Sequence, residues 1–152
     1  MKNFNQINWK KCEKNVFKLQ SKIAVAFNKG LKKKVTILQS ILVNSFWARA
    51  LAVRDVLINK DSNIAGVDNL ILKTSQDKMK LIHKLKNLKD YKAQPLKEVS
   101  ISNLNLNNVQ NLKNQNKNIL LIPTIFDRAV QVLWSYRIRP NMRMYIRREI
   151  LW

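Results

Sequence analysis

The sequence predicts a mainly α fold with one small β-hairpin, an α+β class. Apolar residues recur at helical spacing through most of the chain. Two short strand-like segments flank an asparagine-rich stretch in the second half. The hydrophobic fraction of 46% supports a folded core, and 152 residues are enough for one compact domain or two small helical units.

The N-terminal part predicts two antiparallel helices. The first runs from about Trp9 to Asn28, and Gly30 supplies its C-terminal stop. A second helical run extends from Lys32 to about Asn59, with a break near Asn44-Ser45. A short glycine-containing turn joins the two, which favours a helical hairpin. The apolar positions with helical spacing are Val16, Leu19, Ile23, Phe27, Val35, Leu38, Leu42 and Phe46.

The middle of the chain predicts a loop, a helix and a strand. Residues 60–68 have turn chemistry and are expected to form the loop. A helix is expected from Thr74 to Leu88, and Thr74 with Asp77 has the spacing of a capping box. Leu96–Ser102 then predicts a short strand.

The last elements follow a segment of unusual composition. Asn103–Asn118 is rich in asparagine, has little capacity to bury surface and predicts a long exposed loop. Ile119–Ile122 predicts a second strand that pairs with the first as a hairpin. Thr124 is the expected N-cap of a final helix, and Pro140 is expected to end that helix.

The charge balance predicts a polyanionic partner. Lysine and arginine outnumber the acidic residues by 29 to 9, which gives a formal net charge of +20. A compact domain of this charge repels itself unless a polyanion neutralises it. Nucleic acid is the expected polyanion. Anionic lipid is the competing polyanion, and a membrane partner is disfavoured.

Basic residues of the first helices and of the C-terminal segment are the candidate RNA contacts. For each of them the alternative is a solvated surface without a partner. Arg54 could instead pair with Asp55 or Asp127, and the C-terminal arginines could dock a protein partner. The candidates are Lys10, Lys14, Lys18, Lys22, Lys29, Lys32, Lys33, Lys34, Arg49, Arg54, Arg143, Arg147 and Arg148.

No catalytic residue, cofactor or metal site is expected from the sequence. Cys12 has no partner for a disulfide and no clustered ligand for a metal. His83 has no acid–base partner that the sequence indicates, and is expected on a helix surface. Trp9, Trp47 and Trp134 are expected to pack in the core or between helices, with stacking on RNA bases as the alternative.

Composition also bears on the compartment. A single cysteine favours a reducing compartment. No apolar run approaches the ~20 residues of a membrane-spanning helix, and the basic N-terminus lacks the apolar core of a secretory signal. Heavy use of Lys, Asn and Ile resembles coding in an AT-rich genome. A plastid or mitochondrion is therefore the expected location, with the bacterial cytoplasm as the alternative.

Five segments form a recognisable series along the chain. They are LQSKIAVAFNKG (Leu19–Gly30), LQSILVNSFWARALAVRDVLINK (Leu38–Lys60), AGVD (Ala65–Asp68), PLKEVSI (Pro95–Ile101) and IPTIFDRAVQ (Ile122–Gln131). Together they resemble the N-terminal region of group II intron reverse transcriptase/maturases, from about Trp9 to Pro140. The resemblance implies an RNA-binding N-terminal extension and a fingers subdomain that contains the hairpin. In that family a palm follows, whose paired aspartates hold two metal ions for nucleotidyl transfer.

Departures from that family predict that polymerisation is lost. The chain ends before any palm, and no Tyr-x-Asp-Asp sequence occurs in it. The family's Gly-Lys-x-Arg-Pro-Leu-Gly stretch is replaced by QNKNILL (Gln115–Leu121), with Asn118 in place of the arginine that reaches nucleotide phosphate. Asparagine supplies neither the charge nor the forked donors of guanidinium. Ser102-Asn103 also replaces the family's Pro-Lys after the first strand.

The resemblance and the charge together predict the organisation and the function. The expected organisation is a helical extension over residues 1–60, a partial fingers subdomain over 61–140 and a divergent basic tail over 141–152. The expected function is that of a non-catalytic, truncated maturase-like protein that binds structured RNA, either a group II intron or ribosomal RNA. The alternative is a structural subunit of a large organellar assembly, such as a ribosome or another protein complex. Catalysis with a palm supplied in trans is disfavoured by Asn118.

Overall fold

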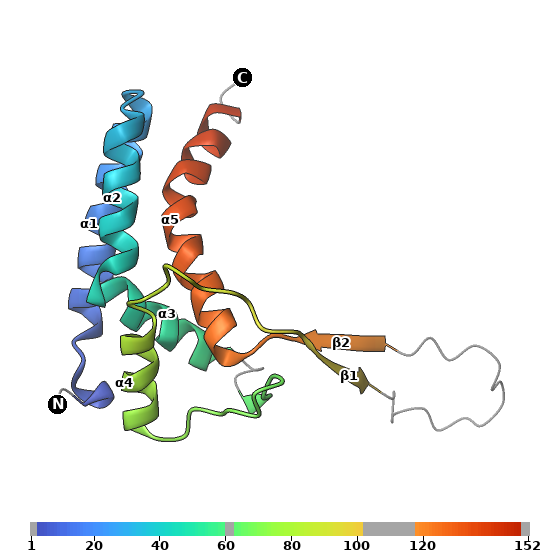
Figure 1. Ribbon diagram of the computed structural model, residues 1–152. Helices are drawn as coiled ribbons and strands as arrows, with labels where there is room; N and C mark the ends of the chain where they lie inside the picture. The colour runs from blue at the N-terminus through green and yellow to red at the C-terminus, as the bar shows by residue number, and fades with distance from the viewer. Residues whose placement is uncertain (1–2, 60–62, 102–117, 150–152) are drawn as a thin grey trace, which may run out of the picture.

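The computed structural model describes residues 3–59, 63–101 and 118–149, and the side chains of residues 100, 101, 118 and 139–149 lie outside the described part. A short 3-10 helix, Phe4–Gln6, precedes the elements that Figure 1 labels. They are α1 (Trp9–Asn28), α2 (Lys32–Asn44), α3 (Phe46–Ile58), α4 (Ser75–Lys84), β1 (Lys97–Ile101), β2 (Asn118–Ile122) and α5 (Ile125–Glu149). The predicted mainly α fold with a small β-hairpin is confirmed.

Helix α1 begins and ends where local groups satisfy its free backbone atoms. The Asn8 side chain accepts a 3.0 Å hydrogen bond from the Lys11 N–H, which is the role of an N-cap. At the other end Gly30 has φ of +70°, and the Leu31 N–H donates to the Ala26 carbonyl at 3.0 Å. This pattern closes a helix with a left-handed residue that glycine adopts without steric cost. The chain therefore reverses into α2, and the predicted helical hairpin is confirmed.

Ser45 produces the break that the sequence predicts between α2 and α3. Its hydroxyl donates to the Leu42 carbonyl at 2.8 Å and accepts from the Ala48 N–H at 3.2 Å. Serine at this position caps the start of α3, while its own extended backbone ends α2.

Helix α3 lies at the centre of the core. It is in contact with α1, α2, α4 and α5, and apolar side chains cover most of its circumference, as expected for a buried helix. Its buried apolar residues are Ala48, Ala50, Leu51, Ala52, Val53 and Val56.

Helix α5 joins the two halves of the chain in one core. It packs against α1, α2 and α3. The Gln20 side chain donates to the Tyr136 carbonyl at 3.0 Å, and the Gln39 side chain donates to the Arg137 carbonyl at 3.2 Å. A single cluster of buried residues thus includes side chains from α1 to α5. The domain boundaries given above stay a prediction.

The two strands form the predicted antiparallel hairpin, with Lys97 opposite Ile122 and Glu98 opposite Leu121. The hairpin extends away from the helices, and β2 leads directly into α5 (Figure 1). Ile122 is buried at this junction, whereas Leu121 is 51% exposed.

Two predicted helix ends are wrong. Helix α4 ends at Lys84, not near Leu88, because Leu85 and Leu88 pack on the core from the following turn. Because Leu85 and Leu88 keep the helical spacing of apolar residues, the sequence pattern extends beyond the end of the helix itself. Helix α5 continues through Pro140 to Glu149. Proline removes one backbone hydrogen bond, but its fixed φ is itself helical, so the helix is not obliged to stop there.

The predicted asparagine-rich loop falls almost entirely on residues 102–117, which lie outside the described residues. Asn118, the last residue of that prediction, belongs to β2.

Candidate nucleic-acid interface

The outward side of α1 carries a row of lysines, here called the lysine face: Lys10, Lys14, Lys18 and Lys22. All four are exposed. Their four-residue spacing places successive members one turn apart along the same side of the helix. The opposite side of α1 faces the core with Cys12, Val16, Ile23 and Ala26. The lysine face therefore presents its charge to solvent because the apolar side of the same helix is buried.

A second group lies between α1 and α2 and is here called the turn cluster: Lys29, Lys32, Lys33 and Lys34. All four are exposed. Three of them occupy the first turn of α2, which has no acidic residue, and its N-cap, Leu31, makes no side-chain hydrogen bond. A helix N-terminus carries a positive partial charge, so lysines there are unfavourable unless an anion approaches. The turn is thus better suited to an anionic partner than to bulk solvent.

The described residues contain few ion pairs to neutralise these lysines. Within residues 3–59, 63–101 and 118–138, the ion pairs are those of Arg54, with Glu13 at 2.7 Å and with Asp55 at 3.5 Å. No member of the lysine face or the turn cluster has an acidic partner in this part of the chain. Among the described residues their charge is therefore not balanced by an ion pair.

Arg54 differs from the lysines because it is engaged within the fold. Burial lowers the pKa of Arg54, but the hydrogen bond to Glu13 and the charges of Asp55 and Glu13 raise that pKa overall. Its guanidinium also lies 5.3 Å from the centre of the Trp9 ring. Of the two structural partners expected for Arg54, Asp55 is the one found. These contacts leave Arg54 out of the interface proposed below.

Arg49 requires a correction, because it is only 6% exposed and cannot present its charge to an RNA from this position. Its Nη1 donates to the Ile82 carbonyl at 2.8 Å, and its Nε donates to the Ser45 carbonyl at 3.3 Å. Ile82 is in the last turn of α4, where carbonyls lack partners within the helix. Burial lowers the pKa of Arg49. Arg49 thus fastens the end of α4 to α3.

The C-terminal arginines lie on α5. The structure describes the backbone of this helix at Arg143, Arg147 and Arg148, but their side chains lie outside the described part. The helix is directed toward the end of the molecule where α1 and α2 meet (Figure 1). Their role in RNA contact stays a prediction.

The sequence reading of the other singled-out residues is largely confirmed. His83 is exposed on α4. Trp9 and Trp47 are partly buried against the core, and Lys11 lies over the Trp47 ring at 5.6 Å. Trp134 is the exception, since it is 41% exposed, and the centre of its ring lies 5.6 Å from that of Tyr91 in an edge-to-face contact.

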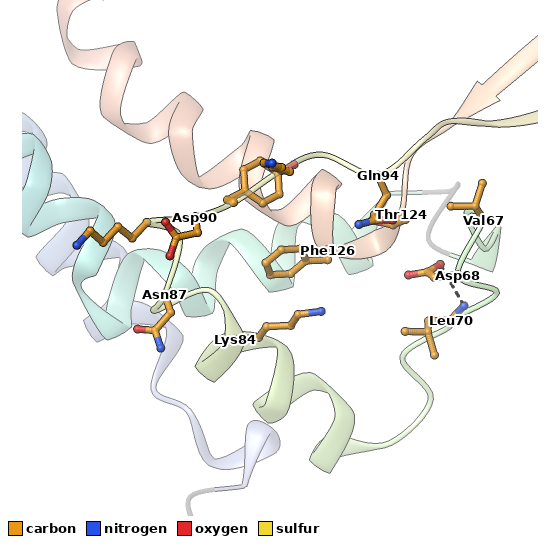
Figure 2. Close-up of a pocket in the computed structure, with 12 residues that line it drawn as sticks. Val67, Asp68, Leu70, Lys84, Asn87, Asp90, Gln94, Thr124 and Phe126 are labelled. Atoms are coloured by element: carbon orange, nitrogen blue, oxygen red, sulfur yellow. Dashed lines mark hydrogen bonds between the residues drawn. The ribbon is translucent and has the colours of Figure 1, made fainter.

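A pocket of about 550 Å³, here called the loop pocket, opens beside the start of α5. Its walls are the loop 67–70 and the segment 84–94, and Thr124, just before α5, and Phe126 of α5 lie between them (Figure 2). Three lysines, Lys84, Lys89 and Lys92, and two aspartates, Asp68 and Asp90, line it. The sequence did not predict this pocket, although the frequent lysines of residues 78–92 were a visible signal.

Asp127 fastens the second wall of the loop pocket to α5. Its carboxylate is buried and accepts hydrogen bonds from the Tyr91 hydroxyl at 2.6 Å, the Gln94 N–H at 3.2 Å and the Thr124 hydroxyl at 2.6 Å. The Thr124 hydroxyl in turn accepts from the Asp127 N–H, so the predicted N-cap is confirmed. Burial, with the neighbouring Asp127 carboxylate, raises the pKa of Tyr91 to about 12.

Gly66 fastens the first wall. A Cβ at this position would lie 2.7 Å from the Thr124 Cα and 2.8 Å from the Thr124 nitrogen. Only glycine allows this approach of loop to helix. Beyond it, Asp68 accepts from the Leu70 N–H at 3.3 Å, and Asn69 accepts from the Lys97 side chain at 3.2 Å. Both walls are therefore held on the first turn of α5.

Within the part of the chain that the structure describes, no three His, Cys, Asp or Glu side chains gather closely enough to hold a metal ion. Among the same residues, no helix has the length and apolar character that crossing a bilayer requires.

Comparison with known proteins agrees with the resemblance seen in the sequence. Residues 4–85, more than half of the chain, match the family described as the N-terminal domain of reverse transcriptase. The chain is also similar to "Maturase-like protein 1" of Euglena gracilis, with 29% identity over 134 residues. That match covers 87% of this chain and 27% of the relative, so the chain spans about a quarter of its length. The chain thus belongs to the reverse transcriptase N-terminal domain family.

Proposed function

We propose that this protein binds structured RNA, through the lysine face and the turn cluster, as a maturase-related RNA-binding unit. The single observation that carries the proposal is the state of those eight lysines. All are exposed, and none has an acidic partner in the described part of the chain. Phosphates approaching such a surface release their counterions, which supplies affinity without sequence-specific contacts.

The fold supports this reading beyond the net charge. The acidic side chains Glu13 and Asp55 pair with Arg54, so neither forms an ion pair with the lysines nearby. The turn cluster adds its charges to the positive end of α2, where the N-cap Leu31 makes no side-chain hydrogen bond to the helix. An RNA backbone brings several phosphates at once, and it can meet both lysine groups along the α1–α2 hairpin.

These 152 residues are proposed to bind RNA without polymerising nucleotides. They contain no Tyr-x-Asp-Asp sequence, and Asn118 stands where the family has a phosphate-binding arginine. Primer extension with this chain alone on an RNA template should give no product above the background without protein. Extension that depends on the protein would contradict this part of the proposal.

A second candidate, a structural role inside a ribonucleoprotein, is favoured by one observation. Exposed apolar side chains stand among the lysines of α1 and α2: Phe17 at 64%, Val25 at 55%, Ile37 at 60% and Ile41 at 50%. A basic surface that only faces solvent gains nothing from exposed apolar side chains. A surface that contacts both protein and RNA in one assembly can bury them against the protein. A plastid or mitochondrial particle fits this candidate, and the compartment is part of the proposal.

Crosslinking the protein to RNA in its native cells, followed by sequencing, tests both candidates. Reads concentrated on one intron would support a maturase-like role. Reads spread over ribosomal RNA, with retention in particles at high salt, would support the structural role. An absence of crosslinked RNA above a control without irradiation would contradict RNA binding itself.

A further inference from the structure

We propose that the loop pocket binds one unpaired nucleotide of the RNA and that guanine is its preferred base. This inference rests on the RNA binding proposed above. It concerns recognition of an unpaired base, which the lysine face and the turn cluster do not provide. Those lysines meet phosphates, which occur at every position of every RNA. The loop pocket offers groups that can distinguish a base.

The size and the construction of the pocket fit a preformed ligand site. Its volume of about 550 Å³ lies within the roughly 300 to 1,000 Å³ that is usual for small-ligand pockets. Gly66 holds one wall by backbone contact with Thr124, and Tyr91 with Gln94 holds the other through Asp127. A ligand entering between fixed walls loses little affinity to ordering them.

The pocket carries charge of both signs: three lysines and Asp90 lie on the 84–94 wall, and Asp68 lies on the 67–70 wall. Figure 2 shows Lys84 and Asp68 reaching into the space from opposite walls. Lys89 and Lys92 add positive charge on the Lys84 side of the chain. A nucleotide fits this arrangement, because its single anionic phosphate can meet the lysines, which outnumber Asp90 on their wall, while the donors on its base meet Asp68. An acidic peptide matches it poorly, since Asp68 and Asp90 would repel its carboxylates.

Asp68 is the group that favours guanine. One of its oxygens accepts from the Leu70 N–H at 3.3 Å, and a carboxylate has about four acceptor sites, so further donors can bind. Guanine presents two adjacent donors, its N1–H and its amino group, to a pair of carboxylate oxygens. Uracil presents one N–H between two carbonyl oxygens, which a carboxylate repels.

Phe126 supplies an apolar surface in the pocket. The Lys84 ammonium lies 4.4 Å from the centre of its ring. When a nucleotide binds, the Lys84 ammonium can leave the Phe126 ring and pair with the phosphate. The base can then stack on the Phe126 ring. Stacking of bases on aromatic rings is the usual way in which proteins hold unpaired nucleotides.

Three RNA hairpins test the proposal: one fully paired, one with a single bulged guanosine and one with a bulged uridine. Wild-type protein is expected to bind the guanosine bulge about tenfold more tightly than the paired hairpin, as one stacked and hydrogen-bonded base would give. Asp68→Asn keeps an oxygen for the Leu70 N–H, and should reduce the preference for guanosine over uridine to less than about threefold. Lys84→Ala should lower the affinity for both bulged hairpins more than the affinity for the paired hairpin.

Lys80→Ala is the matched control, since Lys80 is exposed on α4 and does not line the pocket. This substitution should lower the affinity for all three hairpins by the same small factor. Equal binding of the three hairpins by wild type, or an unchanged guanosine preference in Asp68→Asn, would overturn the pocket proposal. Either result, with tight and salt-sensitive binding of the paired hairpin, would leave the proposed function standing. Failure to bind any hairpin would overturn both.

Discussion

The Tyr91 hydroxyl donates a 2.6 Å hydrogen bond to a carboxylate oxygen of Asp127, across 36 residues of sequence. This contact ties the segment after α4 to the first turn of α5. Asp127 is 2% exposed and accepts from three donors, so its buried charge is compensated by hydrogen bonds. The loop pocket keeps its shape because of this contact and the close approach of Gly66.

Replacing Tyr91 with Phe should destabilise the fold by about 1 to 3 kcal/mol at neutral pH, the cost of losing a hydrogen bond to a buried charged group. Urea unfolding of wild type and Tyr91→Phe measures the difference. The pKa of Tyr91 is raised from 10.0 to about 12 in the fold. The folded chain therefore holds this proton more tightly than the unfolded chain does.

The stability that the Tyr91 hydroxyl contributes is complete below pH 10 and is lost as pH rises toward about 12. The difference between wild type and Tyr91→Phe should therefore shrink above pH 10. Lysine deprotonation affects both proteins equally and cancels in the difference. A difference that stays constant through this range would show that Tyr91 is not coupled to Asp127 in solution.

The same substitution, glycine to asparagine, should have a small cost at one of the two glycines of the chain and a larger cost at the other. At Gly30 there is no atom within 4 Å of an added Cβ and φ is +70°. Asparagine tolerates this conformation better than most residues, so Gly30→Asn should cost about 1 kcal/mol or less. At Gly66 the added Cβ would overlap the backbone of Thr124.

Gly66→Asn should cost about 1 to 3 kcal/mol or more, because backbone must move to relieve the overlap. Thermal unfolding followed by circular dichroism compares the two variants. Equal melting temperatures would mean that the loop does not pack on α5 as described.

Arg49 and Arg54 provide a second matched pair. Arg49→Met should destabilise the fold by about 1 to 3 kcal/mol, because the Ile82 carbonyl is left buried without a donor. Arg54→Met removes a partly exposed ion pair, which is usually worth about 0 to 1 kcal/mol. RNA affinity per folded molecule should be unchanged in Arg49→Met. Loss of affinity in a folded Arg49→Met protein would restore the original prediction that this arginine contacts RNA.

Local sequence signals predicted those parts of the fold that local physics decides. Helix α1 follows from its apolar spacing and from Gly30, and the start of α5 follows from Thr124 and Asp127. Arg49 was misread because its burial depends on the end of α4, 33 residues away. The loop pocket was missed because its two walls come together through tertiary contacts with the start of α5, such as those of Thr124 and Asp127, which sequence spacing does not reveal.

The exposure of the eight lysines could be predicted, because it depends on local pattern and not on distant contacts. A lysine outside an apolar stripe on a helix is exposed whatever the tertiary fold, so the sequence was sufficient to place them. What the sequence could not supply was the scarcity of ion pairs around them. That depends on the ion pairs that Arg54 forms with Glu13 on α1 and with Asp55 on α3.

The salt dependence of RNA binding tests the central claim most directly. Wild type should bind a paired RNA hairpin with an affinity that falls steeply between about 50 mM and about 200 mM salt. Replacing Lys32, Lys33 and Lys34 with alanine should weaken binding and reduce the slope of log K against log salt by about 2 to 3. The matched control replaces the exposed lysines Lys73, Lys80 and Lys86, which lie on and around α4, away from the α1–α2 turn (Figure 1). This control should leave most of the slope intact. An equal reduction by both triple variants, or binding that does not respond to salt, would contradict an RNA interface on the lysine face and the turn cluster.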